Sequence, residues 1–98
     1  MTGRPVDVFF RTSALEQLAQ AQAWYESQRG GLGAEFARSV EAAVARISRQ
    51  PFAAPVVYEA VRRVVLKRFP YSVFYLVEPE RLVVLSCLHT RRNPAGWP

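Results

Sequence analysis

The hydrophobic pattern of this chain changes from a helical period to a period of two at about Val61, and this change limits the fold more than any other feature. From residue 13 to residue 50, apolar side chains recur every three or four positions, which is the spacing of amphipathic helices. From residue 61 to residue 89, apolar and other side chains alternate, which is the spacing of β-strands. Because half of the 98 residues are hydrophobic, we expect both kinds of element to share one core in a single domain, residues 1–98.

The first half of the chain predicts two helices. A capping box from Ser13 to Glu16 predicts the start of the first helix, because its serine oxygen can accept a backbone N–H of the first turn. This helix is expected to end near Gln28. Three glycines between positions 30 and 33 then allow a tight reversal, and the second helix ends before Pro51. Two helices joined by so short a loop should pair antiparallel.

Strand patterns occur before and after this helical hairpin. The predicted strands are Val6 to Arg11, Val61 to Arg68, Tyr71 to Val77 and Leu82 to His89, and Pro51 to Tyr58 is predicted to be a loop. The predicted fold is therefore α+β, with the order β-α-α-β-β-β. The helical hairpin packs on one face of a small, mainly antiparallel sheet.

Two adjacent arginines lie in the second predicted strand, so their side chains must leave opposite faces of the sheet. If the hairpin covers one face, either Arg62 or Arg63 points toward it. A buried arginine without a partner costs several kcal/mol, on the order of 3–5. We expect Glu59 or Glu41 to be that partner.

The net charge of +5 lies entirely in the second half of the chain. Residues 1–60 hold six arginines and six acidic residues, whereas residues 61–98 hold seven basic residues and two acidic ones. Clustered positive charge raises the local potential toward anions. The sequence thus favours an acidic partner, either a nucleic acid or a protein with an acidic segment.

Several classes of site are excluded by what the sequence lacks. One cysteine, Cys87, and one histidine, His89, provide neither an internal disulfide nor the usual four-ligand zinc site. The glycine cluster lies between two helices and not after a strand, so it does not form a phosphate loop. Cys87 is expected to be a small buried hydrophobe. The apolar runs are too short to cross a bilayer, and we expect a soluble cytoplasmic protein without metal or cofactor.

The end of the last predicted strand carries the residue types that metal-independent RNA cleavage needs. Such cleavage uses a proton acceptor, a proton donor and cations that hold the phosphate. The available groups are His89, Tyr71 or Tyr75, and Arg63, Lys67, Arg91 or Arg92. The alternative is that His89 makes a structural hydrogen bond at the sheet end and that both tyrosines belong to the core.

An ordered set of short strings spans nearly the whole chain. The strings are Ala23-Trp24-Tyr25-Glu26, Gly33 with Phe36, Ile47 with Pro51, Val61-Arg62-Arg63, Leu66-Lys67-Arg68-Phe69-Pro70-Tyr71, Val73-Phe74-Tyr75, and His89-Thr90-Arg91-Arg92-Asn93-Pro94 followed by Trp97. With this set, the chain resembles the ParE/RelE superfamily of small bacterial toxins from type II toxin–antitoxin modules, often called plasmid-stabilisation proteins.

This resemblance implies a protein that is harmful when free and silenced by a cognate antitoxin. The implied antitoxin is acidic, partly disordered and ParD-like, and places a helix and a strand against the hairpin and the sheet. A homodimer and a heterotetramer with the antitoxin both stay open. RelE-like members cut messenger RNA on the ribosome, whereas ParE-like members poison DNA gyrase and lack the nuclease residues.

The sequence departs from the RelE-like pattern at two positions where that pattern is basic. One is Val65, two residues after Arg63 in the second predicted strand, and the other is Ser72, directly after Tyr71. By contrast, Arg91 matches the arginine beyond the last strand, and His89 resembles a histidine of some ribosome-dependent members. We therefore expect a ParE-like toxin acting on DNA gyrase, with a RelE-like messenger RNA endoribonuclease as the alternative.

The resemblance also implies particular site residues. For a nuclease, the catalytic residues would be His89, Arg91 and Arg63. The residues expected to bind the target or the antitoxin are Arg62, Arg63, Lys67, Arg68, Tyr71, Arg91, Arg92, Trp97 and Trp24.

Overall fold

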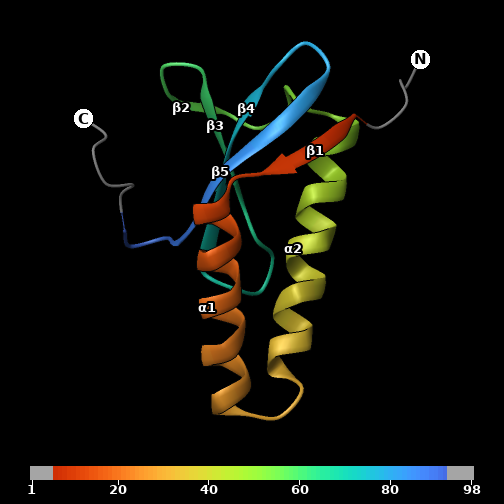
Figure 1. Cartoon of the computed structure of the whole chain (residues 1–98). Coiled ribbons are helices and arrows are strands. Elements are labelled where there is room, and N and C mark those ends of the chain that lie inside the picture. Colours follow the sequence, from red (N-terminus) through yellow and green to blue (C-terminus); the bar gives the residue numbers. More distant parts are fainter. Residues whose placement is uncertain (1–5, 93–98) are drawn as a thin grey trace.

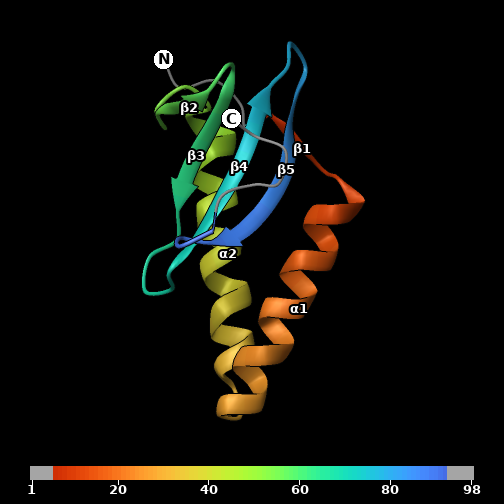
Figure 2. The same ribbon diagram turned by 90° about the vertical axis from the view of Figure 1, so that its left-hand side faces the viewer.

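The computed structural model describes residues 6–92, in which two long helices pack against a five-stranded sheet (Figure 1). The elements are β1 (Asp7–Phe10), α1 (Thr12–Gln28), α2 (Leu32–Arg49), β2 (Val56–Tyr58), β3 (Val61–Val65), β4 (Tyr71–Val77) and β5 (Arg81–His89). The helical hairpin extends beyond one end of the sheet in both views (Figures 1 and 2). The predicted α+β fold with a helical hairpin on a sheet is confirmed.

The strand order of the sheet is β1-β5-β4-β3-β2. β1 pairs parallel with β5, and all other pairs are antiparallel, so the sheet is mixed and mainly antiparallel, as predicted. In β4 and β5, Tyr71 lies opposite His89 and Val73 lies opposite Cys87. This register brings the start of β4 and the end of β5 to the same end of the sheet.

Two details of the predicted strands were wrong. The predicted loop before Val61 contains the short strand β2, which follows Pro55 and pairs antiparallel with β3. Because β2 is an edge strand, the preceding proline removes no ladder hydrogen bond, and two β-branched valines favour the extended backbone. β3 ends at Val65, three residues earlier than predicted, because the chain turns at Arg68 with a φ of 74°.

The predicted capping box at the start of α1 was also wrong. The N-cap residue is Arg11, and no side chain caps this helix end. Ser13 already lies inside the first turn, where its hydroxyl donates a long hydrogen bond of 3.4 Å to the carbonyl oxygen of Leu85 in β5. The serine therefore connects the helix to the sheet, a tertiary contact that a local sequence pattern does not reveal. The predicted ends of both helices are confirmed.

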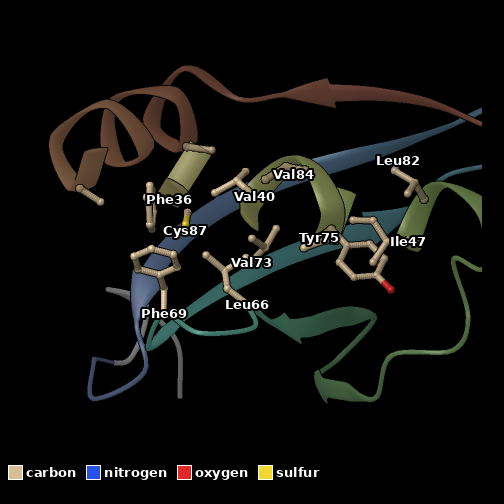
Figure 3. Packing of buried hydrophobic residues seen from close by; sticks show 13 residues of the cluster. Phe36, Val40, Ile47, Leu66, Phe69, Val73, Tyr75, Leu82, Val84 and Cys87 are labelled. Atoms are coloured by element: carbon tan, nitrogen blue, oxygen red, sulfur yellow. The ribbon is translucent and has the colours of Figure 1, made fainter. Parts of the chain in front are cut away.

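The main core lies between the helices and one face of the sheet (Figure 3). Both helices contribute apolar side chains spaced three or four residues apart, and the sheet contributes the residues that face them. The fully or almost fully buried members are Ala14, Ala21, Phe36, Val40, Ala43, Ile47, Leu66, Phe69, Val73, Tyr75, Leu82, Val84 and Cys87. Tyr75 is completely buried, and its hydroxyl donates a 2.7 Å hydrogen bond to the carbonyl oxygen of Pro51.

The turn between the helices is held by a carboxylate from α1. Glu26 accepts hydrogen bonds from the backbone N–H groups of Gly31 and Gly33 at 2.9–3.1 Å, so it caps the N-terminus of α2. Gly31 has a φ of 90°, which favours glycine. These hydrogen bonds lower the pKa of Glu26, because they stabilise its charged form. Glu26 therefore has a structural role at this turn.

Replacing Glu26 by glutamine should reduce stability at neutral pH, because the amide is a weaker acceptor than the carboxylate. A carboxyl group whose folded-state pKa is lowered stabilises the fold above its unfolded pKa. This contribution is lost as the pH falls through the folded-state value. In urea unfolding at pH 7, the free energy of unfolding should be larger for wild type than for Glu26→Gln, and this difference should shrink as the pH falls below the unfolded pKa of a glutamate, about 4.3. Glu16→Gln, on the exposed side of the same helix, is the control. A gap that does not change with pH would contradict this role.

No helix within residues 6–92 is both long enough and apolar enough to span a membrane.

Candidate functional site

Two of the predicted chemistry-bearing residues, Tyr71 and His89, meet where β4 begins and β5 ends. The rings of Tyr71 and His89 lie edge to face with their centroids 5.4 Å apart. The chain turns immediately afterwards, because the backbone N–H of Arg92 donates to the carbonyl oxygen of His89 at 2.9 Å. The backbone N–H of Arg91 donates to Nδ1 of His89 at 3.1 Å, so a neutral imidazole carries its proton on Nε2.

A cavity of about 210 Å³ opens beside this pair, between α1 and the end of β5, and is called here the Tyr71–His89 pocket. Trp24 contributes from α1 and is 56% exposed, so it offers a large apolar surface to solvent. The cavity is lined by Gln17, Gln20, Ala21, Trp24, Tyr71, Cys87, Leu88, His89 and Arg92. Four predicted site residues therefore share one cavity: Trp24, Tyr71, His89 and Arg92.

The wall of this pocket is completed by a contact between α1 and the edge of β5. β1 ends at Phe10, so it pairs with β5 only as far as Val84. Beyond that point, the side-chain oxygen of Gln17 accepts a 2.8 Å hydrogen bond from the backbone N–H of Cys87. Cys87 is 1% exposed, and burial raises the pKa of its thiol to about 12. The prediction that Cys87 is a small buried hydrophobe is therefore confirmed.

A cluster of aromatic rings links this pocket to the helical hairpin. Tyr25 stacks on Phe36 at 5.3 Å and meets Tyr71 edge to face at 6.0 Å. Burial raises the pKa of both tyrosines, and for Tyr25 the neighbouring Tyr71 adds to the effect. Both phenols are therefore protonated near neutral pH, so Tyr71 can donate a proton or a hydrogen bond but is not a ready base.

The two adjacent arginines of β3 point to opposite faces of the sheet, as predicted. Arg62 lies opposite Tyr75 on the face toward the helices. The prediction that Glu59 or Glu41 pairs with this arginine was wrong. Arg62 donates to the carbonyl oxygens of Phe52 and Ala54, at 3.1 and 2.6 Å. Backbone acceptors satisfy it because the loop before β2 folds over its side chain, and the Phe52 ring stacks 5.1 Å from its guanidinium.

Arg63 is exposed and lies on the other face of the sheet. It is opposite Phe74, which belongs to a second apolar cluster with Val61 and Leu88. His89 lies opposite Tyr71, which packs against the core under the helices. The structure therefore does not bring Arg63 and His89, two members of the predicted nuclease set, to one site. By contrast, the exposed Arg91 lies next to His89, to which its backbone N–H is hydrogen-bonded.

The remaining predicted cations, Lys67 and Arg68, lie in the loop after β3, and neither lines the Tyr71–His89 pocket. The Arg68 guanidinium pairs with Glu35 of α2 at 3.1 Å, and Arg29 pairs with the other oxygen of the same carboxylate at 3.3 Å. The hydroxyl of Ser39 donates to the carbonyl oxygen of Lys67 at 2.8 Å, which fixes the loop against the helix. Trp97 lies outside the described residues.

Between this loop and α2 runs a groove of about 430 Å³, called here the α2 groove. Sequence reasoning missed it, because three of its arginines come from the half of the chain whose net charge is zero. The groove is lined by Glu35, Arg38, Ser39, Ala42, Ala45, Arg46, Arg49, Lys67 and Arg68. The signal was present in the sequence: positions 38, 42, 45, 46 and 49 share one side of a helix at 100° per residue.

A neighbouring cavity of about 510 Å³ shares Arg46 and Arg49 with the α2 groove and extends it toward the sheet. Ile47, Ala53, Ala54 and Val64 give this extension an apolar lining. The fold therefore brings three arginines of the neutral half of the chain, Arg38, Arg46 and Arg49, together with Lys67 and Arg68 of the basic half. Within residues 6–92, no group of three or more His, Cys, Asp or Glu side chains is placed to hold a metal ion.

The fold is a small α+β domain in which a helical hairpin packs on a mixed sheet, and two solved structures have a similar fold. The chromosomal ParDE toxin–antitoxin system from P. aeruginosa is similar at a TM-score of 0.64 and 17% identity, covering 86% of this chain and 95% of that one. The toxin–antitoxin complex RelBE2 from Mycobacterium tuberculosis is similar at a TM-score of 0.61 and 23% identity, covering 88% and 99%. At these identities, the likeness establishes the fold alone.

The family is established by sequence. The family model described as the ParE toxin of the type II toxin–antitoxin system parDE matches residues 8–94. The chain therefore belongs to the ParE toxin family, and the resemblance to the ParE/RelE superfamily is confirmed. No curated protein matches the sequence.

Proposed function

We propose that this chain is the toxin of a type II toxin–antitoxin pair and that, when free, it binds DNA gyrase and does not cut RNA. Its membership of the ParE toxin family supports the toxin role. The similar solved structures are a ParDE system and a RelBE2 complex, which supports a cognate antitoxin as its resident partner. Both candidate targets are cytoplasmic, and we place the protein there.

The observation that favours gyrase over RNA is the separation of Arg63 from His89. Cleavage by a ribose 2′-hydroxyl needs a proton acceptor and phosphate-holding cations around one phosphate. Arg63 leaves the sheet on the face opposite to the helices, whereas His89 lies beside Tyr71 on the helix side. One phosphate therefore does not reach both side chains. In addition, Nδ1 of His89 already accepts a backbone hydrogen bond.

A supercoiling assay tests this proposal. Purified chain is titrated into DNA gyrase with relaxed plasmid and ATP, and in parallel into translating ribosomes, whose messenger RNA is mapped by primer extension. We expect supercoiling to be inhibited and the messenger RNA to stay intact. Unchanged supercoiling at saturating toxin would overturn the gyrase target.

The alternative is a RelE-like endoribonuclease, and one observation favours it: Tyr71, His89 and Arg92 line one pocket. In that reading, Arg92 or Arg91 would hold the phosphate, His89 would accept or donate the proton through Nε2, and the protonated Tyr71 would be a donor. Cleavage sites in the primer-extension arm would establish this reading.

Replacing His89 by alanine distinguishes the two functions. If the chain acts by binding gyrase, His89→Ala should inhibit supercoiling within about threefold of wild type, because the imidazole would provide no chemistry. If it is a nuclease, loss of a general acid or base should reduce cleavage by roughly 10²- to 10⁴-fold. Growth arrest in an inducible host and the two assays above provide the measurement. Loss of arrest in His89→Ala, with an unchanged thermal midpoint, would contradict the gyrase proposal.

A further inference from the structure

We propose that residues 93–98 dock on the face of the sheet that is turned away from the helices, with Trp97 as the anchor. This face is called here the open face. Its apolar cluster consists of Val61, Phe74, Leu76, Leu85 and Leu88. The inference is carried by the described residues of the face that the segment covers, and it does not depend on the proposed function.

The strand register defines which side chains belong to the open face. Residues directly opposite each other in a sheet point to the same side, and neighbours along a strand point to opposite sides. Val73 lies opposite Cys87, and both belong to the core under the helices. The neighbouring pair, Ser72 opposite Leu88, therefore points to the open face. Within residues 6–92, all five members of the apolar cluster come from β3, β4 and β5, and neither helix contributes.

The apolar side chains of the open face are buried, although α2 lies behind β3 and β4 when this face is toward the viewer (Figure 2). Val61, Phe74 and Leu88 are at most 8% exposed. In an antiparallel sheet with one face packed on a core, side chains of the other face are ordinarily solvated. So low an exposure therefore points to a further segment of chain over this face.

The described segments next to the sheet do not supply this cover, because they pack on the helix side. The loop before β2 folds over Arg62, on the face toward the helices. The loop between β3 and β4 contributes Leu66 and Phe69 to the main core. Before β1, the backbone N–H of Val6 donates to the carbonyl oxygen of Ser48 in α2. The segment that follows β5 is the remaining candidate.

Two serine hydroxyls of the open face lack a hydrogen-bond partner. Ser72 and Ser86 are both more than nine-tenths buried, and among the described residues their Oγ atoms are unpartnered. Ser72 lies opposite Leu88 and Ser86 lies opposite Phe74, so both hydroxyls lie among apolar side chains. A buried hydroxyl without a partner destabilises a fold. A covering segment removes this cost, because its carbonyl oxygens accept from the hydroxyls and an indole N–H donates to them.

The chain after Arg92 has the reach for this place. The backbone N–H of Arg92 donates to the carbonyl oxygen of His89, so the chain turns directly after β5. From Arg92 to Trp97, five extended residues span about 17 Å. Along β5, Ser86 lies about 10 Å from His89, at about 3.3 Å per residue. Trp97 can therefore reach Leu88 and the centre of the cluster.

The segment also matches the open face chemically. Residues 93–98, Asn-Pro-Ala-Gly-Trp-Pro, contain no charged side chain. Pro94 restricts the undocked chain, which lowers the entropy lost on docking. A tryptophan can bury about 150–250 Å² of surface, which suits a broad apolar cluster. Trp97 is then held by its own chain and is not free to contact the target or the antitoxin.

Tryptophan fluorescence tests the proposal. The chain has two tryptophans, so Trp24→Phe leaves Trp97 as the only one. We expect its emission at shorter wavelength than that of N-acetyl-tryptophanamide, with several-fold weaker quenching by acrylamide, and both effects should disappear in urea. The matched control is Trp97→Phe, in which the 56% exposed Trp24 should be quenched strongly. Emission and quenching of Trp97 equal to those of the free amide would overturn the proposal.

A double-mutant cycle identifies the face on which Trp97 docks. The free energy of unfolding in urea is compared for Trp97→Ala, Leu88→Ala and the double variant. We expect the double variant to lose less than the sum of the two single losses, because both changes remove the same contact. The control is Val73→Ala, on the helix side of β4, whose loss should add to that of Trp97→Ala. Additive losses for Leu88 would overturn the docking site.

Two other arrangements give different results. If Trp97 is protected only at concentrations where the chain sediments as a dimer, a second copy covers the open face and docking within one chain is wrong. If Trp97→Ala couples to Gln20→Ala and not to Leu88→Ala, Trp97 occupies the Tyr71–His89 pocket, which also overturns the proposal. The fluorescence variants leave the cluster intact, so they decide the question even if Leu88→Ala does not fold.

Discussion

Replacing Phe36 by alanine is expected to lower the free energy of unfolding by about 3–5 kcal/mol, because the change leaves a large cavity in a packed core. The Phe36 ring is 1% exposed, stacks on Tyr25, and meets Phe69 and Tyr71 edge to face at 5.3 Å. It therefore joins α1, α2 and the start of β4. Domains of this size are typically stable by about 5–15 kcal/mol, so the variant would be marginal.

Urea unfolding followed by circular dichroism measures this change, with Leu15→Ala as the matched control. Leu15 is 52% exposed on α1, so its truncation should cost less than about 0.5 kcal/mol. A loss below about 1 kcal/mol for Phe36→Ala would mean that this ring does not hold the hairpin on the sheet.

The second large effect is expected at Gly33, where alanine should destabilise the protein by about 1–3 kcal/mol. A Cβ atom at this position would lie 2.9 Å from the backbone carbonyl oxygen of Gln22 and 2.9 Å from the carboxylate of Glu26. The backbone of α1 must then move, which also disturbs the Glu26 cap of α2. Helix propensity acts in the other direction, since alanine is favoured over glycine by roughly 1 kcal/mol, and steric overlap should outweigh it.

Gly30→Ala is the matched control for this prediction. The nearest atom to a Cβ at Gly30 is the Glu26 carboxylate at 4.0 Å, so the side chain has room. The midpoint of thermal unfolding should be lower for Gly33→Ala than for wild type, and it should be almost unchanged for Gly30→Ala. Equal shifts would indicate that backbone freedom, and not the close contact of the two helices, explains the glycine.

The sequence pattern was sufficient for the helical hairpin and the three long strands, because their apolar periodicity follows the core directly. It failed where a tertiary contact decides the structure. The hydroxyl of Ser13 donates a hydrogen bond to the carbonyl oxygen of Leu85 in β5 and does not cap the helix. Arg62 donates to backbone carbonyl oxygens of the loop before β2, whereas the sequence-based prediction considered only carboxylates as its partners. Local patterns do not contain such contacts.

The candidate site was predictable in part. Tyr71, His89 and Trp24 could be chosen from the sequence, but only the strand register shows that Arg63 leaves the opposite face of the sheet. The α2 groove was missed because charge was counted along the chain, where acidic residues cancel Arg38, Arg46 and Arg49. In three dimensions, Lys67 of the loop after β3 joins these arginines, and Glu35 of the same lining is already paired with Arg29 and Arg68.

The most direct test of the central claim is growth after induction of this chain in a bacterial host, with and without the product of the adjacent antitoxin gene. The account predicts arrest by the chain alone and normal growth when the antitoxin is co-expressed. Undisturbed growth in the presence of the folded wild-type chain alone would contradict the claim that this protein is a toxin.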